Sequence, residues 1–575
     1  MNDRGAGKDM NMRTLFRNGR IVNVFTDTVQ KTNVLIEGGR IIGVGAYTEE
    51  DADRVEDIGG KVICPGLIDG HIHIESTMLS PAEFVRACLP HGTTTVIADP
   101  HEIANVSGLY GIGYMIEVSR KLPMSVYYTV PSCVPATEFD ESGGVLNAQD
   151  IAVLFSDPHV IGLGEMMNFP GVIAGVPAVT DKINAAHGAG KLINGHAPMI
   201  TGKDLDRYIA AGIFDDHECS TMAEATERLN KGQWIMIRQG TAARNLDALL
   251  PLFEEPVSRR CLLVTDDKHP ADLLYNGHID SIIRQAVQKG APVLTAVRMA
   301  TLQAAQRFGL SDLGAIAPGY QADFLILDEL ETMKVRDVYR HGEKVVDDGR
   351  ITDFEDPQVR PDIWKAVRNS VMLRKQDCTM FHIEPGHGPC RVIQVIPDQL
   401  ITRERRVELD FSRNNGVNTE NDIIKLAVIE RHVDSGHIGL GYINGLGIRK
   451  GAIASSVSHD SHNLIVAGVS DEDMVVAANH IREIGGGLAV VRDGEVLADM
   501  PLPIAGLMGL GNASEMAEQN RKVREAAAEL GSAPGIEPFM NLAFVSLPVI
   551  PDIKMTTQGL VDVNAWKRVP LFVNQ

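Results

Sequence analysis

The stretch KVICPGLIDGHIH, residues 61–73, sets the expected fold. It is an apolar run that ends in two histidines, His71 and His73, and in an extended strand their spacing points both imidazoles to one face. Seven more apolar or β-branched runs follow before residue 310, each with a loop and usually a helix-like stretch behind it. They are TTTVIADPH (93–101), SVYYTVPS (125–132), HVIGLGE (159–165), KLINGH (191–196), GIFDDHE (212–218), QWIMIRQG (233–240) and CLLVTDD (261–267).

Eight β/α units predict an α/β fold, a (β/α)₈ TIM-type barrel over residues 64–317. The alternative is a doubly wound open sheet, which the missing G-x-G-x-x-G after the first strand disfavours. Residues 13–63 and 318–350 are rich in short strands and Asn-Gly or Gly-Gly turns, and we expect them to form one discontinuous β-sheet domain. Residues 376–575 are expected to form a C-terminal α+β domain, after a linking segment over 351–375.

Composition excludes several classes of function. The net charge of -21 repels phosphate backbones, so no nucleic-acid partner is expected. No run of 18 apolar residues suggests a membrane span, and the polar start of the chain predicts no secretory signal. Seven scattered cysteines without a C-x-x-C pair favour reduced thiols in a cytoplasmic protein. We also expect the protein to be a homo-oligomer.

Metal-ligating residues fall where the predicted strands end, and in a barrel the catalytic groups gather at that rim. The set comprises His71 and His73 on strand one, Glu165 on strand four, His196 on strand five, His217 on strand six and Asp266 on strand eight. A single histidine at a strand end is usually structural, but imidazoles and carboxylates together suit Mn, Fe or Zn. Six ligands exceed what one catalytic zinc uses, so the set predicts two cations that share a carboxylate and activate water.

Other polar residues at the same rim allow two interpretations each. His101 and Glu102 either border the site or stabilise their loop. Glu218 either transfers protons or orients the adjacent His217. Asp267 follows Asp266, and adjacent residues on a strand face opposite ways, so it faces the site only if the loop after the strand redirects it.

Two further segments also allow two interpretations each. Arg238 and Gln239 either read the edge of a substrate or hold a loop through a salt bridge. The tail motif SHDSHN, residues 458–463, is either a turn bonded to its own backbone or a loop that caps the barrel mouth and contacts substrate, with an additional metal as a further option.

The motifs resemble those of the amidohydrolase superfamily over residues 13 to about 370. The stretches are PGLIDGHIHIE (65–75) and the later strand ends NGH, DDHE and VTDD. Within that superfamily the chain is similar to the adenine deaminases through HIHIESTMLSPAEF (71–84), ADPHEIANVSG (98–108), GLGEMMNFPGV (162–172), TDDKHPADL (265–273) and a tail stretch at residues 436–468. Many two-metal members bridge their cations with a carboxylated lysine on strand four. This chain has Glu165 there and Lys191 at the wrong end of strand five, so Glu165 is inferred to bridge.

The resemblance implies hydrolytic deamination of adenine to hypoxanthine and ammonia by a metal-bridging hydroxide that attacks carbon six. It implies Asp266 as the base beside the metals and Glu218 as the second candidate for proton transfer. It implies two divalent metal ions, Mn or Fe rather than Zn. The alternative is a cyclic amide hydrolase of the same superfamily, similar to dihydroorotase or hydantoinase, and a third hypothesis is a metal-free scaffold.

Overall fold

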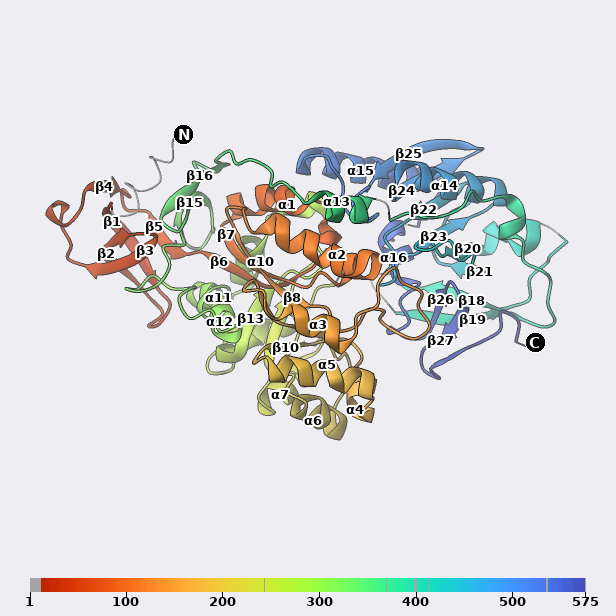
Figure 1. The fold of residues 1–575 in the computed structure, drawn as a ribbon, viewed down its shortest axis with the longest axis horizontal. Helices are drawn as coiled ribbons and strands as arrows, with labels where there is room; N and C mark the ends of the chain where they lie inside the picture. The colour runs from red at the N-terminus through yellow and green to blue at the C-terminus, as the bar shows by residue number, and fades with distance from the viewer. Residues whose placement is uncertain are drawn as a thin grey trace.

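The computed structural model describes residues 12–241, 243–368, 370–397, 401–412, 414–533 and 536–573. The molecule is elongated, with three parts in a row (Figure 1). A β-rich part that holds the start of the chain lies at one end, a part with parallel strands and many helices lies in the middle, and the C-terminal part lies at the other end.

The middle part is a TIM-like α/β barrel whose strands form two arcs. The first arc is a parallel sheet of β6 (Leu67–Ile72), β7 (Thr93–Ala98), β8 (Ser125–Val130), β9 (Val160–Met166) and β10 (Leu192–Gly195). The second is a parallel sheet of β11 (Asp215–Asp216), β12 (Trp234–Arg238) and β13 (Cys261–Val264). The arcs meet where the Asp266 N–H donates to His71 O at 3.0 Å and, on the other side, where the Gly195 N–H donates to Asp215 Oδ1 at 2.6 Å.

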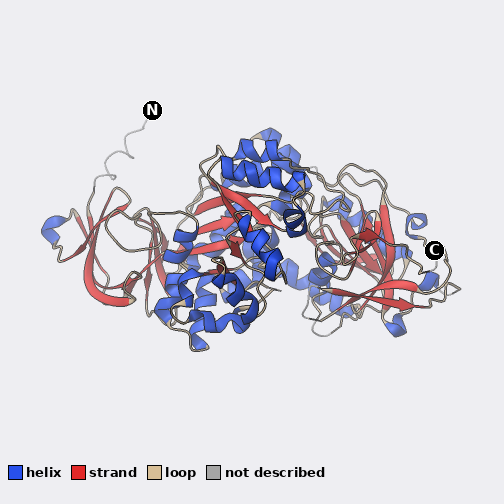
Figure 2. Cartoon of the chain, turned by 90° about the horizontal axis from the view of Figure 1, so that it is seen from below, coloured by secondary structure: helices blue, strands red, loops and turns tan. Residues whose placement is uncertain are grey.

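Helices surround these strands (Figure 2). Their starts follow ordinary capping chemistry: Ser80 accepts from the Glu83 N–H in front of α1, and Thr221 with Glu224 forms a capping box on α7. The helices are α1 (Pro81–Cys88), α2 (His101–Ser119), α3 (Ala148–Leu154), α4 (Phe169–Ala174), α5 (Pro177–Gly188), α6 (Gly202–Ala210), α7 (Met222–Asn230), α8 (Leu246–Leu249), α9 (Pro270–Asn276), α10 (Ile279–Gln288), α11 (Val293–Met299) and α12 (Leu302–Arg307).

The N-terminal sheet joins segments from both sides of the barrel. Its order is β17-β16-β15-β14-β5-β1-β2-β3, with β4 also paired to β1. The strands are β1 (Thr14–Asn23), β2 (Thr28–Glu37), β3 (Arg40–Gly45), β4 (Arg54–Asp57), β5 (Val62–Pro65), β14 (Phe324–Leu327), β15 (Val335–Arg340), β16 (Glu343–Asp347) and β17 (Arg350–Ile351). β5 pairs antiparallel with β14, and the rings of Phe16, Phe324 and Tyr339 pack together in its core.

The stretch 61–73 is therefore two strands rather than the single strand expected. β5 ends at Pro65 in the N-terminal sheet and β6 begins at Leu67 in the barrel. Between them lies Gly66, where a Cβ would come within 2.2 Å of Thr94 Oγ1. The close approach of the second barrel strand leaves room for glycine alone at this change of sheet.

The C-terminal part is built on an eight-stranded sheet of order β19-β18-β21-β20-β23-β22-β24-β25. Its strands are β18 (Cys390–Val395), β19 (Thr402–Val407), β20 (Ile423–Ile429), β21 (Ile438–Asn444), β22 (Ala452–Ser455), β23 (Leu464–Gly468), β24 (Gly487–Arg492) and β25 (Glu495–Pro501). The helices of this part are α14 (Asp471–Ile484), α15 (Ala513–Glu529) and α16 (Pro538–Phe544), and a small sheet follows with β26 (Ile553–Thr556), β27 (Gly559–Asp562) and β28 (Lys567–Arg568).

The expected linking segment contains a packed helix. α13 (Pro361–Arg368) lies against α2, with Ile363 and Val367 buried and the Trp364 ring 6.2 Å from that of Tyr114. Its apolar positions at i and i+4 supply the buried face that makes it a helix. Among the described residues the cysteines are unpaired, and Cys378 alone is exposed. None of the described helices combines the length and apolar character of a membrane span.

Candidate active site

Glu165, at the end of β9, lies at the centre of the predicted ligand set. Its Oε2 is 2.8 Å from His196 Nδ1 and 3.2 Å from His217 Nε2. Its Oε1 is 3.3 Å from His73 Nε2. One carboxylate thus contacts histidines that follow β6, β10 and β11.

His71 and Asp266 complete the set on the side of His73. Asp266 Oδ1 is 3.2 Å from His73 Nε2 and 3.9 Å from His71 Nε2. His71 Nε2 is buried without a hydrogen-bond partner among the described residues, 4.0 Å from Glu165 Oε2. Asp266 has φ 60°, a left-handed conformation that is rare outside glycine, and its bonded N–H holds it there. The structure therefore brings all six predicted ligands together.

Three of these separations, those of His73 from Glu165 and Asp266 and that of His217 from Glu165, fit ligand atoms of a shared divalent cation, while the 2.8 Å contact of His196 is a hydrogen bond. Two ligand atoms about 2.1 Å from one cation lie roughly 3–3.5 Å apart, close to the contacts above. His73 Nδ1 faces Asp99 O at 2.9 Å, so Nδ1 carries the hydrogen and Nε2 offers its lone pair to the site. Burial would raise the pKa of Glu165, but the neighbouring histidines, His196 first, hold it well below its usual range. The possible metal ligands are thus carboxylate oxygens and imidazole nitrogens, a combination that suits two divalent cations.

Arg238, at the end of β12, ties two carboxylates together. Its Nη1 donates to Glu218 Oε1 at 2.5 Å and also to Asp266 Oδ2. Burial alone would raise the pKa of Glu218, but the Arg238 charge lowers it below its ordinary value. Glu218 itself is 3.3 Å from His217 Nε2, so β11 ends early enough for consecutive residues to face one site. Gln239 is turned away and donates to Gln285 Oε1 at 3.1 Å.

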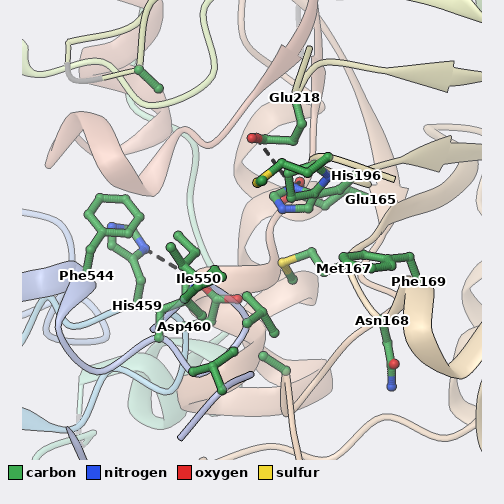
Figure 3. A pocket seen from close by; sticks show the side chains of 18 of the residues that line it. Glu165, Met167, Asn168, Phe169, His196, Glu218, His459, Asp460, Phe544 and Ile550 are labelled. Atoms are coloured by element: carbon green, nitrogen blue, oxygen red, sulfur yellow. Dashed lines mark hydrogen bonds and ion pairs between the residues drawn. The ribbon is translucent and has the colours of Figure 1, made fainter. Parts of the chain in front are cut away.

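A cavity of about 490 Å³ opens beside this cluster. Glu165, His196 and Glu218 lie on one side of it, while His459, Asp460 and Phe544 from the C-terminal part lie on the other (Figure 3). Its remaining wall is largely apolar, with Met167, Phe169, Leu547, Ile550, Val563 and Trp566. No local pattern marks Phe544, Ile550 or Trp566 as cavity residues, because isolated apolar residues in a separate domain cannot be distinguished from core residues by sequence.

His101 bridges the two sides of the cavity. Its Nδ1 lies 3.4 Å from Glu165 Oε1, and its Nε2 lies 3.7 Å from Asp460 Oδ1. Asp267 also lines the cavity, and accepts from Ser76 Oγ at 2.6 Å. His101 therefore borders the site, and the 458–463 loop contributes His459 and Asp460 to the cavity wall.

Glu102, His459 and His462 form a neighbouring buried cluster, but its hydrogen bonding opposes a metal there. The Ser458 N–H donates to His462 Nδ1 at 3.2 Å, so the neutral ring carries its hydrogen on Nε2. That Nε2 faces Glu102 Oε2 at 3.6 Å, and Glu102 Oε1 accepts from Ser76 Oγ. The 3.6 Å separation is too long for a hydrogen bond, and neither His462 Nε2 nor Glu102 Oε2 has a hydrogen-bond partner among the described residues. Glu102 does not line the cavity.

Known proteins resemble this chain along its whole length. Residues 62–352 match the amidohydrolase family, and residues 399–567 match the adenine deaminase C-terminal domain. An adenine deaminase of Desulfatibacillum aliphaticivorans is 46% identical over 571 residues, 99% of this chain and 98% of the relative. This chain belongs to the adenine deaminase family. The family resemblance predicted from the motifs is confirmed.

A second relative agrees with this family assignment. Adenine deaminase 2 of Carboxydothermus hydrogenoformans is 45% identical over 562 residues, 97% of this chain and 96% of the relative. Among solved structures, enamidase, described as a member of the amidohydrolase superfamily, covers 59% of this chain and 97% of its own, with 18% identity and a TM-score of 0.46. Membership of the amidohydrolases implies divalent metal ions, and the described residues include several groups able to hold them.

Proposed function

We propose that this chain hydrolyses the exocyclic amine of adenine to give hypoxanthine and ammonia, at two divalent cations held by Glu165 and the five other proposed ligands around it. The observation that carries the proposal is the contact of one buried carboxylate with histidines from three strand ends, in a chain whose relatives are adenine deaminases. His71, His73 and Asp266 would hold one cation, His196 and His217 the other, and Glu165 both.

The cations would supply Lewis acidity, which lowers the pKa of a bound water from 15.7 to about 7. The residues of the chain do the rest. Asp266 and Glu218 are anionic and stand on either side of Arg238, so they are placed to accept a proton and return it to the ring or the leaving amine. Arg238 fixes the separation of the two carboxylates, and the apolar wall excludes bulk water.

Three finer points belong to this proposal. Mixed imidazole and carboxylate ligation fits Mn or Fe at least as well as Zn. The proposed domains are 13–63 with 318–350, the barrel at 64–317 and the C-terminal domain at 376–575. Because β5 ends at Pro65 and β17 at Ile351, the edges of the first domain are moved to those residues. A cytoplasmic location and a homo-oligomeric state are supported by the unpaired cysteines and by the class of enzyme, respectively.

A substrate panel tests the proposal. The purified protein, with its metal content measured, is assayed on adenine, adenosine, guanine, cytosine and dihydroorotate. We expect loss of adenine absorbance with one ammonia released per adenine. A fully metallated preparation that leaves adenine intact would refute the proposal, and ring opening of dihydroorotate would favour the cyclic amide alternative, which the names of the relatives do not favour.

A further inference from the structure

Asp460 lines the cavity and carries a carboxylate oxygen, Oδ2, that no group in the described chain satisfies. The side chain is buried, with 3% of its surface exposed, yet it lines the cavity. Its Oδ1 faces His101 Nε2 at 3.7 Å. Its Oδ2 is buried and has no hydrogen-bond partner among the described residues. A buried acceptor without a partner is unfavourable by itself, which points to a donor supplied by a ligand.

The position of Asp460 relative to Glu165 limits what that donor is. The two carboxylates lie on opposite sides of the cavity (Figure 3), and the imidazole ring of His101 spans the distance between them. Apolar side chains, including Phe169, Phe544 and Ile550, line the space beside them. A flat heterocycle held there with its reacting carbon toward Glu165 would turn its opposite edge toward Asp460.

We propose that Asp460 accepts the imidazole-ring N–H of adenine and thereby restricts the enzyme to the free base. In adenine the exocyclic amine and the N9–H lie at opposite ends of the bicyclic ring. A nucleoside has a sugar carbon in place of that hydrogen, so Asp460 would stay buried and unpaired beside it. Sites built to bond a substrate N–H or O–H reject analogues that lack it much more strongly than apolar pockets reject extra carbon. The inference rests on the proposed function of this cavity.

The charge state of Asp460 agrees with an acceptor role. Burial would raise its pKa, but the charge of His101 lowers it below the ordinary value. An ionised carboxylate accepts hydrogen bonds and donates none. A competing role is orientation of His101 alone, which would use Oδ1 and leave Oδ2 unexplained.

Three variants separate these roles. Asp460→Ala removes the acceptor, and Asp460→Asn keeps the size and one acceptor oxygen without the charge. Asp473→Asn is the matched control, because Asp473 is a buried acid of the same domain whose Oδ1 accepts the Gly494 N–H at 2.8 Å, outside the cavity lining. Each is assayed on adenine and on 9-methyladenine, which has no imidazole N–H, with metal content and melting temperature recorded.

We expect the wild-type protein to prefer adenine to 9-methyladenine by about 100-fold or more in kcat/KM. Asp460→Ala should lose about 100-fold on adenine, mainly through KM, and change little on 9-methyladenine, so that the preference disappears. Asp460→Asn should lose about 10-fold on adenine. Metal content should match the wild type, and Asp473→Asn should behave as the wild type.

Two results would overturn the inference alone. One is wild-type turnover of 9-methyladenine equal to that of adenine. The other is an equal loss on both substrates in Asp460→Ala, which would assign Asp460 to the orientation of His101. A metallated wild-type protein inactive on adenine would instead overturn the proposed function together with the inference.

Discussion

The Glu165 carboxylate lies within 3.4 Å of four histidines from four separate segments of the chain: His73, His101, His196 and His217. Its side chain is shorter than a carboxylated lysine, and the structure accommodates it because β9 delivers the carboxylate directly between the two histidine groups. A buried carboxylate without a charge partner would be unfavourable, and the surrounding histidines provide that partner.

Glu165→Gln should remove the shared anionic ligand without changing the size of the side chain. We expect the bound metal to fall below half of the wild-type content and kcat/KM on adenine to fall at least about 10³-fold, because the amide cannot hold two cations. Elemental analysis and the adenine assay measure this. Glu83→Gln on α1 serves as the control, and full metal loading with wild-type rates in Glu165→Gln would remove Glu165 from the site.

Asp140→Asn tests a buried acid outside the metal cluster. Burial raises the pKa of Asp140 to about 7, and the Thr137 Oγ that donates to it at 2.8 Å only partly offsets this. Because the pKa is raised in the folded state, the native protein keeps this proton at pH values where the unfolded chain has lost it. The free energy of unfolding therefore falls between about pH 4 and 7, and the full destabilisation is present above about pH 7. We expect Asp140→Asn to raise the free energy of unfolding by up to about 4 kcal/mol at pH 8 and to change it little at pH 4.

Denaturant titrations of both proteins at the two pH values measure this difference. A gain of the same size at both pH values would show that the ionisation of Asp140 is not its cause.

The grouping of the six proposed ligands could be predicted from the sequence because polar residues at the strand ends of a barrel meet at one rim, where a short motif such as His71-x-His73 carries its own geometry. Asp460 could not be placed, because its contact with His101 joins residues 359 positions apart through the packing of two domains. The role of Arg238 could not be predicted either, because the sequence does not distinguish a salt bridge, which the structure shows to Glu218 and Asp266, from a substrate contact.

β11 consists of only two residues, Asp215 and Asp216, yet it must present His217. Buried ion pairs of Asp215 and Asp216 hold this short strand in position. Arg228 Nε donates to Asp216 Oδ2 at 2.6 Å, and Arg307 Nε donates to Asp215 Oδ2 at 2.7 Å. Asp216 Oδ1 also accepts the Glu218 N–H at 2.8 Å, which fixes the turn that carries both His217 and Glu218.

Arg228→Met should therefore destabilise the protein and displace His217. Arg228 is fully buried, so its removal leaves the Asp216 charge without a partner, and such losses cost about 3–5 kcal/mol. We expect that decrease in the free energy of unfolding, with a reduced kcat. Arg207→Met is the matched control, because Arg207 pairs with Asp204 on the exposed face of α6 and should contribute less than about 1 kcal/mol. Equal effects of the two changes would contradict the assigned role of Arg228.

The apolar pattern predicted the barrel strands well because buried parallel strands read as continuous apolar runs. It overestimated β11, since Gly212, Ile213 and Phe214 extend the run without entering the sheet. It also missed α13, whose eight residues lie in a polar stretch where only the packing on α2 reveals the buried face.

At the scale of the whole molecule, Glu141 links the barrel to the C-terminal part. Its Oε1 is 2.7 Å from His437 Nδ1, its Oε2 accepts from Thr557 Oγ1, and its main-chain oxygen accepts from Asn463 Nδ2 at 2.7 Å. These contacts hold the 458–463 loop over the barrel mouth, so the cavity exists only between the two parts.

Removal of the cations should lower the stability of the entire molecule. The ligand cluster is buried and anionic, so a bound cation stabilises the folded state by an amount that grows with its concentration, about 4 kcal/mol at 1,000 times Kd. We expect chelation to abolish adenine hydrolysis and lower Tm by several degrees, and added Mn²⁺ or Fe²⁺ to restore both. An unchanged Tm and full activity after complete metal removal would exclude the binuclear site.

The wall of the cavity formed by Phe544, Ile550 and Trp566 has a consequence for biosynthesis. Domains fold from the N-terminus as the ribosome delivers them, so the barrel and its histidines emerge long before this wall. A nascent chain that already carries every proposed ligand would lack this wall until residues 544–566 had left the exit tunnel. A premature stop codon or a nick by a protease in that final stretch would therefore silence the enzyme while sparing most of its mass.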